Sequence, residues 1–408
     1  MREDYTLSHA RNRYLRCASF LTMTLPTPAE QLTYFRKQQN QIIDTIQQLV
    51  EIESPSDVKA ALDRLGTVLT SRFSELGGKV RVHRAEKFGN HLEIRFKAAR
   101  VSNSKPILLL GHTDTVYPIG TISKMPFRVA KVRVFGPGVL DMKGGIALIL
   151  HVIEALLGWN GGKLPRPVTV FLVSDEEVGS ASSRAITEKL ARESSGVLVL
   201  EPAAGSNGAV KTSRKGVGEY ELCVAGKAAH SGLDFEKGQS AVIELAYQVL
   251  EISKLVDLQR GITLNVGKVK GGTRVNVVPA EARASIDVRI TKKEDAAEVE
   301  RRLRALKPFN PNCKISLSGG INRPPMERTP GVAALFTKAA SVARELGWDL
   351  EEAAVGGGSD GNFTAALGIP TLDGLGVVGE GAHAEHESLL ISELPRRAAL
   401  LAGLITSI

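Results

Sequence analysis

Three acidic residues stand at the end of an apolar run near the middle of the chain. Val168–Val173 is rich in β-branched side chains and predicts a strand buried on both faces, and Asp175, Glu176 and Glu177 follow it. Unpaired charge beside a buried strand is costly, so these carboxylates need partners. One glutamate could bind a metal ion while its neighbour takes a proton from water. The alternative is an acidic N-terminal cap on the next helix.

Two more apolar runs end in residues that could bind a metal ion. Residues 106–110 predict a buried strand followed by His112 and Asp114, and residues 197–200 predict another followed by Glu201. A lone histidine at such a place is more often structural. In a His-x-Asp sequence, however, the aspartate can hold the second imidazole nitrogen and orient the ring for a metal ion.

Further candidate ligands lie in glycine-rich loops. Asp141 precedes the apolar helix predicted at residues 146–157, where it is either the helix cap or a metal ligand that the nearby glycines let the backbone bring close. His383 and His386 lie in a second glycine-rich loop and compete for the role of last ligand. In open α/β sheets, ligands collect beyond the carboxyl ends of parallel strands, so we expect these side chains to converge on one sheet edge.

The elements that must position these residues predict an α/β fold: a mixed, mostly parallel sheet flanked by helices. After residues 205–208 the pattern changes to strand, helix, strand, strand, helix, strand, which is typical of a ferredoxin-like βαββαβ domain. Residues 356–362 form a glycine-rich loop that lacks the lysine of a phosphate-binding loop, and we interpret it as backbone lining a pocket. The predicted division is an N-terminal extension (1–30), a first catalytic part (31–210), an inserted domain (211–322) and a second catalytic part (323–408).

Composition narrows the class of protein. The 408 residues include 52 Lys and Arg against 44 Asp and Glu, a net charge of +8, without a basic block interleaved with aromatics, so we expect no nucleic-acid partner. A mild positive field suits small anionic substrates. Three widely spaced cysteines indicate neither a disulfide framework nor a cysteine zinc site. Apolar runs stay below the ~18 residues of a membrane span, so no membrane partner is expected.

The N-terminus allows two interpretations. Arg11, Arg13 and Arg16 precede a weakly apolar stretch that Ser19 and Thr22 interrupt, and no small-residue cleavage site follows. We interpret this stretch as a non-core extension of a cytoplasmic protein, with an export signal as the alternative.

Taken together, these motifs resemble the co-catalytic zinc carboxypeptidase/deacylase family, which includes glutamate carboxypeptidase, acetylornithine deacetylase and succinyl-diaminopimelate desuccinylase. The resemblance runs from about Leu32 onward, and residues 226–232 and 395–397 make it closest to glutamate carboxypeptidase. The motifs that carry it are GHTDTV (111–116), GPGVLDMKGG (136–145), SDEEVGS (174–180), Glu201-Pro202 and the closing His-x-x-x-Glu.

The resemblance implies a site with two zinc ions, whose ligands Co²⁺ or Mn²⁺ could share. It places His112 and Glu201 on one ion and Glu177 and His383 on the other, with Asp141 bridging. It selects His383 because the family's histidine stands four residues before a glutamate, here Glu387. In the family a cis peptide often follows the bridging aspartate.

The resemblance also implies roles for residues around the ions. Glu176 would be the general base, Asp114 the partner of His112, and His230 the oxyanion donor reaching in from a partner subunit. Such a donor implies a homodimer formed through the inserted domain. The resemblance further implies that the substrate contacts are Arg289, Asn276, Gly358 and Ser359.

The expected activity is hydrolysis of an amide bond next to a carboxylate-bearing amino acid, in a small peptide or N-acyl amino acid. Release of a C-terminal glutamate is the first hypothesis, and deacylation of an N-acyl amino acid is the second. A non-catalytic binding protein on the same fold is the third, but it predicts a missing ligand or base, and each motif here is complete.

Overall fold

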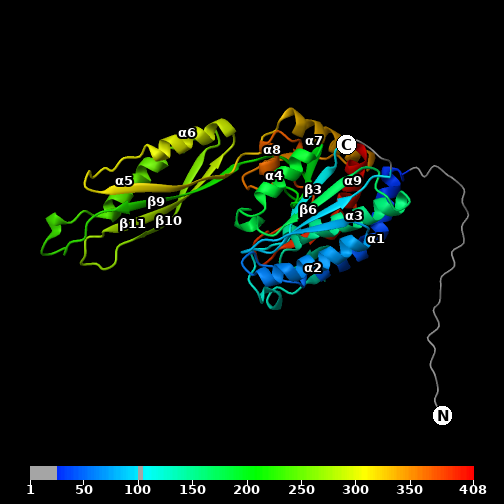
Figure 1. Cartoon of the computed structure of the whole chain (residues 1–408), viewed down its shortest axis with the longest axis horizontal. Helices are drawn as coiled ribbons and strands as arrows, with labels where there is room; N and C mark the ends of the chain where they lie inside the picture. The colour runs from blue at the N-terminus through cyan, green and yellow to red at the C-terminus, as the bar shows by residue number, and fades with distance from the viewer. Residues whose placement is uncertain (1–24, 100–103) are drawn as a thin grey trace, which may run out of the picture.

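The computed structural model describes residues 25–99 and 104–408, which form two bodies (Figure 1). The larger body is built on a six-stranded sheet, and the smaller one is an elongated four-stranded sheet that extends away from it. The predicted extension is described only from residue 25 onward, so the arginines and Cys17 of its first part lie outside the described residues. Within the described ranges, we find no helix that is both long and apolar enough to cross a membrane.

The large sheet is mixed and mostly parallel, as predicted. Strand β3 pairs in parallel with β6 and β7, and β14 continues the parallel part beside β7, whereas β1 and β2 add antiparallel strands at one edge. In spatial order the strands are β1 (Lys79–His83), β2 (His91–Phe96), β6 (Val168–Val173), β3 (Ile107–His112), β7 (Gly196–Val199) and β14 (Thr371–Leu372).

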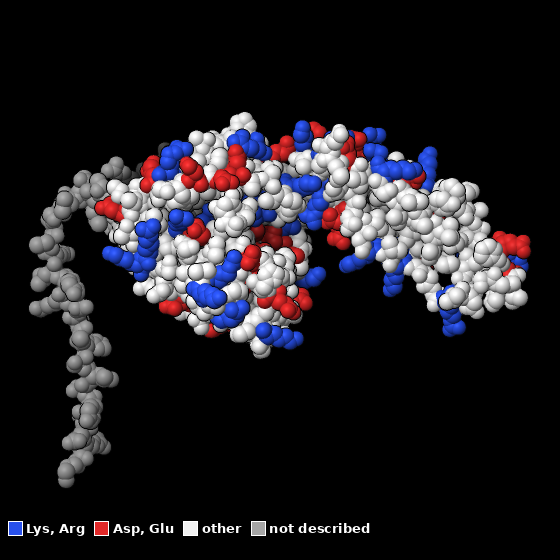
Figure 2. Space-filling view, turned by 180° about the vertical axis from the view of Figure 1, so that it is seen from behind, with Lys and Arg blue, Asp and Glu red and all other residues white. Residues whose placement is uncertain are grey.

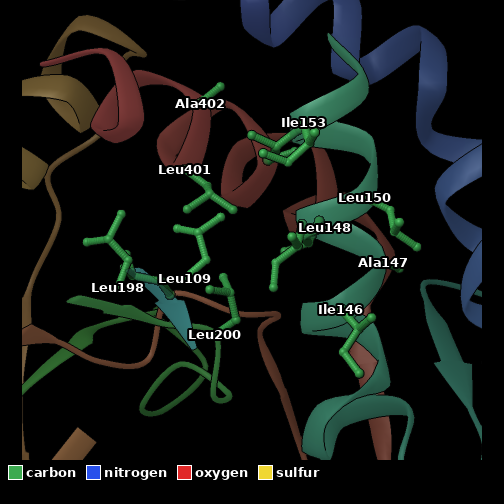
Figure 3. Close-up of a cluster of buried hydrophobic side chains, with 14 of the residues drawn as sticks. Leu109, Ile146, Ala147, Leu148, Leu150, Ile153, Leu198, Leu200, Leu401 and Ala402 are labelled. Carbon is green, nitrogen blue, oxygen red and sulfur yellow. The ribbon is translucent and has the colours of Figure 1, made fainter. Parts of the chain in front are cut away.

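Helices cover both faces of this sheet because successive side chains of the central strands point to opposite faces. Leu109 and Leu198 belong to the main core with α3 and α9 (Figure 3). Leu108 and Leu110 belong to a second core with α4. Helix α3 is apolar nearly all round because it lies between the sheet and helices α1 and α9. The helices of this body are α1 (Pro28–Val50), α2 (Lys59–Glu75), α3 (Gly144–Trp159), α4 (Arg184–Glu193), α7 (Pro330–Glu345), α8 (Gly361–Ala366) and α9 (Leu394–Ser407).

The smaller body has the predicted βαββαβ order. Its strands run β10-β11-β9-β12 across an antiparallel sheet, with α5 and α6 packed on the face that buries alternate residues such as Tyr220, Leu222 and Ile286. This strand order is that of a ferredoxin-like domain. The elements are β9 (Gly216–Ala225), α5 (Ala241–Ser253), β10 (Thr263–Gly271), β11 (Glu281–Ile290), α6 (Lys293–Arg304) and β12 (Lys314–Arg323).

Two small sheets that the sequence analysis did not predict complete the larger body. One pairs β8 (Val210–Arg214) with β13 (Glu352–Val355), and the chain enters the smaller body directly after β8. The other joins β15 (Gly379–Glu380), β16 (Ser388–Leu390), β5 (Arg133–Phe135) and β4 (Arg128–Ala130). Pairing of β16 with β5 brings the glycine-rich loop after β5 next to the loop that precedes β16.

Candidate metal centre

The parallel strands bring three candidate ligand groups to one edge of the large sheet. His112 is the last residue of β3 and pairs with Val173, the last residue of β6, so Glu176 and Glu177 emerge beside it. Glu201 follows β7, the neighbour of β3 on the other side. Figure 2 shows acidic side chains in a hollow of the larger body, near the smaller one. The expected convergence is therefore present in the structure.

His112 lies at the centre of the cluster. Its Nε2 atom is 3.0 Å from Asp141 Oδ1 and 3.4 Å from Glu201 Oε1. Two sets of possible ligand atoms lie within 4.8 Å of one another: His112 with Asp141 and Glu177, and His112 with Glu176 and Glu201. Such imidazole and carboxylate donors suit Zn²⁺ and related divalent ions.

The other imidazole nitrogen of His112 fixes which tautomer is present. Nδ1 lies 2.9 Å from the backbone carbonyl oxygen of Asp114, which can only accept, so Nδ1 carries the proton. Nε2 of the neutral ring then directs a lone pair at Asp141 and Glu201. These lone-pair atoms face each other in a buried site, so they need a proton or a cation between them. The imidazole and carboxylate atoms of the cluster therefore fit a bound metal ion.

Asp114 holds both His112 and the start of the acidic segment in place. Its carboxylate lies 3.5 Å from His112 Nδ1, accepts the Ser56 hydroxyl at 2.8 Å, and accepts the backbone N–H groups of Glu176 and Glu177 at 3.2 and 3.1 Å. One buried carboxylate thus orients a candidate ligand and the two candidate glutamates together.

Asp141 is presented by an irregular turn. Gly138 has a φ of +71°, and a Cβ atom there would lie 2.7 Å from the Thr115 side chain. A turn over Val139–Lys143 follows, in which Asp141 and Met142 have non-helical backbone angles, and the Asp141–Met142 peptide is cis, as the resemblance implied. The glycine is therefore needed both for its backbone conformation and for close packing.

The structure separates the two histidines of the last loop. His383 Nε2 lies 3.2 Å from both carboxylate oxygens of Glu177 and 3.4 Å from Asp141 Oδ2. His386 packs instead against Gly381 of the same loop. His383, with a φ of +64°, is thus the histidine that meets Asp141 and Glu177.

Both imidazoles of the cluster lie in a field that favours positive charge. Hydrogen bonds to Asp141 and Glu177 raise the pKa of His383 to about 10. Burial lowers the pKa of His112, but its contacts with Asp114, Asp141 and Glu201 outweigh burial and raise that pKa well above its usual value. The same field would favour a bound cation.

Glu176 is held by an arginine that the sequence analysis missed. Arg323, the last residue of β12, donates to Glu176 Oε1 at 2.8 Å and to the backbone carbonyl of Glu176 at 2.9 Å. Burial nevertheless raises the pKa of Glu176 well above its usual range. A raised carboxylate pKa suits a group that takes up and releases a proton near neutral pH.

Glu201 is also held by an unforeseen arginine. Arg214 is buried at the end of β8, donates to Glu201 Oε2 at 3.2 Å, and binds Asp373 through two hydrogen bonds of 2.8 and 2.9 Å. It also donates to the carbonyl groups of Gly357 and Gly358 at 3.1 Å. Arg214 therefore fixes one oxygen of a candidate ligand relative to the glycine loop.

Replacing Arg214 by methionine is expected to lower the free energy of unfolding by about 3–5 kcal/mol, because Asp373 would remain buried without its partner. Denaturant unfolding of protein kept metal-free by a chelator measures this cost apart from metal binding. The matched control is Arg328→Met, which breaks an exposed pair with Glu352 and should cost less than about 1 kcal/mol. Equal costs for the two variants would contradict the inferred role.

The remaining predicted site residues lie outside this cluster. His230 and Asn276 are exposed neighbours in the smaller body, where Ser231 N–H donates to the Asn276 carbonyl at 3.1 Å. Arg289 lies near the other end of β11, binds Asp287 and donates to the Gly356 carbonyl at 3.3 Å. Their roles stay predictions.

Gly358 and Ser359 lie beside the site network. Gly358 packs against Val217 and Arg323. Ser359 is fully buried and donates its hydroxyl to Asp373 at 2.5 Å. The hydroxyl therefore supports the Arg214–Asp373 pair in this structure, and contact with substrate stays a prediction for both residues.

Comparison with known proteins agrees with this geometry. Residues 108–407 match the description "Peptidase family M20/M25/M40". The chain belongs to this family and is a metal-dependent hydrolase, which confirms the resemblance seen in its motifs.

Particular relatives indicate which kinds of hydrolase are similar. The chain is 31% identical to carboxypeptidase G2 of Pseudomonas sp. (strain RS-16) over 374 residues, 90% of this chain and 89% of that protein. It is 26% identical to a succinyl-diaminopimelate desuccinylase of Ectopseudomonas mendocina over 347 residues, 80% of this chain and 88% of that protein. The crystal structure of aminopeptidase PepT from Bacillus cereus shares its fold, with a TM-score of 0.76, 22% identity, and coverage of 90% of this chain and 98% of that one.

Proposed function

We propose that this protein is a two-zinc hydrolase that cleaves the amide bond next to a C-terminal, carboxylate-bearing amino acid, with glutamate as the first candidate. The observation that carries the proposal is the meeting of His112, Asp141, Glu177, Glu201 and His383 at one sheet edge, with Glu176 beside them. The similarity to carboxypeptidase G2 over nearly the whole chain supports a carboxypeptidase.

In this proposal His112 and Glu201 would hold one ion, Glu177 and His383 would hold the other, and Asp141 would contribute to both sites. The bound ions would polarise the substrate carbonyl and lower the pKa of the attacking water. Glu176 takes the proton of that water as its oxygen attacks the amide carbon, and then delivers it to the leaving nitrogen. Arg323 donates to the Glu176 carboxylate, and the Glu176 backbone N–H donates to Asp114, so both contacts keep Glu176 in place for the two transfers.

The oxyanion donor is proposed to come from a second copy of the chain. Arg289 lies near the end of β11 and contacts Gly356 of the larger body. Asn276 lies before Glu281, the residue at which β11 begins. At about 3.4 Å per residue, the eight steps from Glu281 to Arg289 span roughly 27 Å. His230 lies beside Asn276, so one subunit cannot offer Arg289 and His230 to the same small substrate.

The smaller body also offers a surface suited to pairing with its own copy. Strand β10 is an edge strand, and α5 packs against it and β11. Helix α5 exposes an apolar stripe of Ile243, Tyr247 and Leu250, the first and last of which are 60% exposed. Among the described residues no strand pairs with the outer edge of β10, and such an edge beside exposed apolar residues supports a homodimer formed through this body.

The substrate proposal is tested by a hydrolysis screen with added zinc. The screen compares dipeptides and N-acyl amino acids that share one acyl group and vary in the C-terminal residue, including glutamate. The proposal expects activity to depend on zinc, to be lost with a chelator, and to prefer a C-terminal glutamate. Preference for N-acetyl amino acids of other types would favour the second candidate, an N-acyl-amino-acid deacylase, which the similarity to a desuccinylase supports.

Arg289→Met is expected to raise KM for the preferred substrate by about 10- to 150-fold, because it removes charged hydrogen bonds to the substrate carboxylate. Steady-state kinetics of the purified variant measure this change. The control is Arg283→Met, an exposed arginine of the same strand that faces Glu221. An unchanged KM in Arg289→Met would remove this residue from the substrate site.

A further inference from the structure

The carboxylate of Glu387 joins two loops that carry candidate metal ligands. It lies four residues after His383 and is 1% exposed. Its Oε1 accepts the backbone N–H groups of Leu140 and Asp141 at 2.7 and 3.0 Å, and its Oε2 accepts the N–H of Gly138 at 3.0 Å. A residue of the His383 loop is therefore hydrogen-bonded to the turn that contains Asp141, including the Asp141 backbone itself.

A third ligand-bearing segment enters the same contact through Tyr117. This residue follows the His112–Asp114 segment, and its hydroxyl lies 2.6 Å from Glu387 Oε2 and 3.0 Å from the carbonyl oxygen of Ala384. The main chain of Glu387 adds two bonds, because its N–H donates to Ala384 at 3.0 Å and its carbonyl accepts the Gly136 N–H at 3.4 Å. Segments 112–117, 136–141 and 381–387 are thus tied together at one side chain.

The contacts involve both oxygens of the Glu387 carboxylate. Each of the two oxygens lies within hydrogen-bond distance of two donors, so all four contacts use the side chain as an acceptor. An amide at position 387 would direct its NH₂ group at one or two backbone N–H donors, so it cannot reproduce this arrangement.

We propose that Glu387 is a positioning residue of the metal centre, which sets the placement of Asp141 relative to His383 and thereby the affinity for the ion that His383 binds. The inference rests on the proposed function for the existence of that ion. His112 and Glu201 stand on strand ends of the large sheet, so their placement does not depend on Glu387. The ion proposed for His112 and Glu201 should therefore be affected less than the ion proposed for Glu177 and His383.

The test compares Glu387→Gln with Glu385→Gln, a neutralised glutamate at an exposed position of the same loop. Zinc per subunit after dialysis and competition with a chromogenic chelator measure the two affinities without any substrate. Glu387→Gln is expected to bind one of the two ions about 10- to 100-fold more weakly, as when other partners of metal ligands are removed. Glu385→Gln should bind both ions as the unmodified chain does.

Two further readouts separate positioning from general damage to the fold. The visible spectrum of Co²⁺-loaded Glu387→Gln should lose the absorption of one site while keeping that of the other. Activity of the variant should recover as the zinc concentration is raised. Equal weakening of both ions, or zinc binding unchanged from the Glu385→Gln control, would overturn the proposal.

Tyr117→Phe keeps the test decisive if Glu387→Gln does not fold. It removes one hydroxyl contact and retains the three backbone bonds, so a weakening of about 2- to 10-fold is expected for the same ion. Unchanged binding of both ions in Tyr117→Phe would then overturn the proposal. Because these readouts need no substrate, a failed hydrolysis screen would reject the proposed substrate while leaving the role of Glu387 to the metal measurements.

Discussion

Glu176→Gln is expected to lower kcat by about 10²- to 10⁴-fold while the zinc content stays unchanged, because the variant keeps every proposed ligand and loses only the proton acceptor. Glutamine preserves the shape of the side chain and can still accept the hydrogen bond from Arg323. KM should change little, since Glu176 is not among the proposed carboxylate contacts. Steady-state kinetics together with metal analysis of the same preparation measure both parts of the prediction.

The control for this experiment is Glu75→Gln, at an exposed position of the end of α2, which should leave kcat and zinc content as they are. Retained activity in Glu176→Gln would remove this residue as the base. Loss of zinc in parallel with activity would instead make Glu176 a ligand, a role that its place in one of the two possible ligand sets allows.

Mixing two inactive variants is expected to restore activity. His230→Ala should lose about 10²- to 10³-fold in kcat, the usual effect of removing an oxyanion donor. A dimer of one His230→Ala subunit and one Glu176→Gln subunit contains one intact site, because the first supplies Glu176 and the second supplies His230. Random pairing makes half of the dimers mixed, so co-expression should recover about a quarter of the unmodified activity per subunit.

Recovery of activity in the mixture is expected because the length of the smaller sheet separates His230 from Arg289 of the same subunit. If His230 served its own subunit, every site in the mixture would lack either the base or the donor, and activity would not recover. The control pairs Glu176→Gln with a subunit that carries both changes, since this mixture lacks an intact site under either arrangement. Recovery in the first mixture alone would establish that His230 crosses between subunits.

Much of the fold followed from local patterns along the chain. Buried strands such as Val168–Val173 are continuous apolar runs, and alternating strands such as Gly216–Ala225 bury every second residue, so each pattern predicts its kind of sheet. The small sheet of β15, β16, β5 and β4 was missed because each of its strands is only two or three residues long. Strands this short are stabilised by the strands they pair with and have too few residues to show an alternation of apolar and polar side chains.

The order of residues along the chain already places candidate ligands after the central strands, and parallel neighbours in one sheet bring His112, Glu177 and Glu201 to one edge. The residues of the last loop left His383 and His386 as alternatives, and the resemblance favoured His383. The folded chain brings His383 to Asp141 and Glu177, because the loop turns at His383 and Glu387 anchors it. Tertiary structure also decided the supporting ion pairs.

Arg214 and Arg323 lie on strands, where an isolated arginine is usually solvated, and their partners are distant in sequence: Asp373 is 159 residues from Arg214, and Glu176 is 147 residues from Arg323. Local patterns record burial and backbone preference, whereas such pairs form only when packed elements exclude water around them. The candidate ligands could therefore be predicted from the sequence, whereas the ion pairs that hold them in place could not.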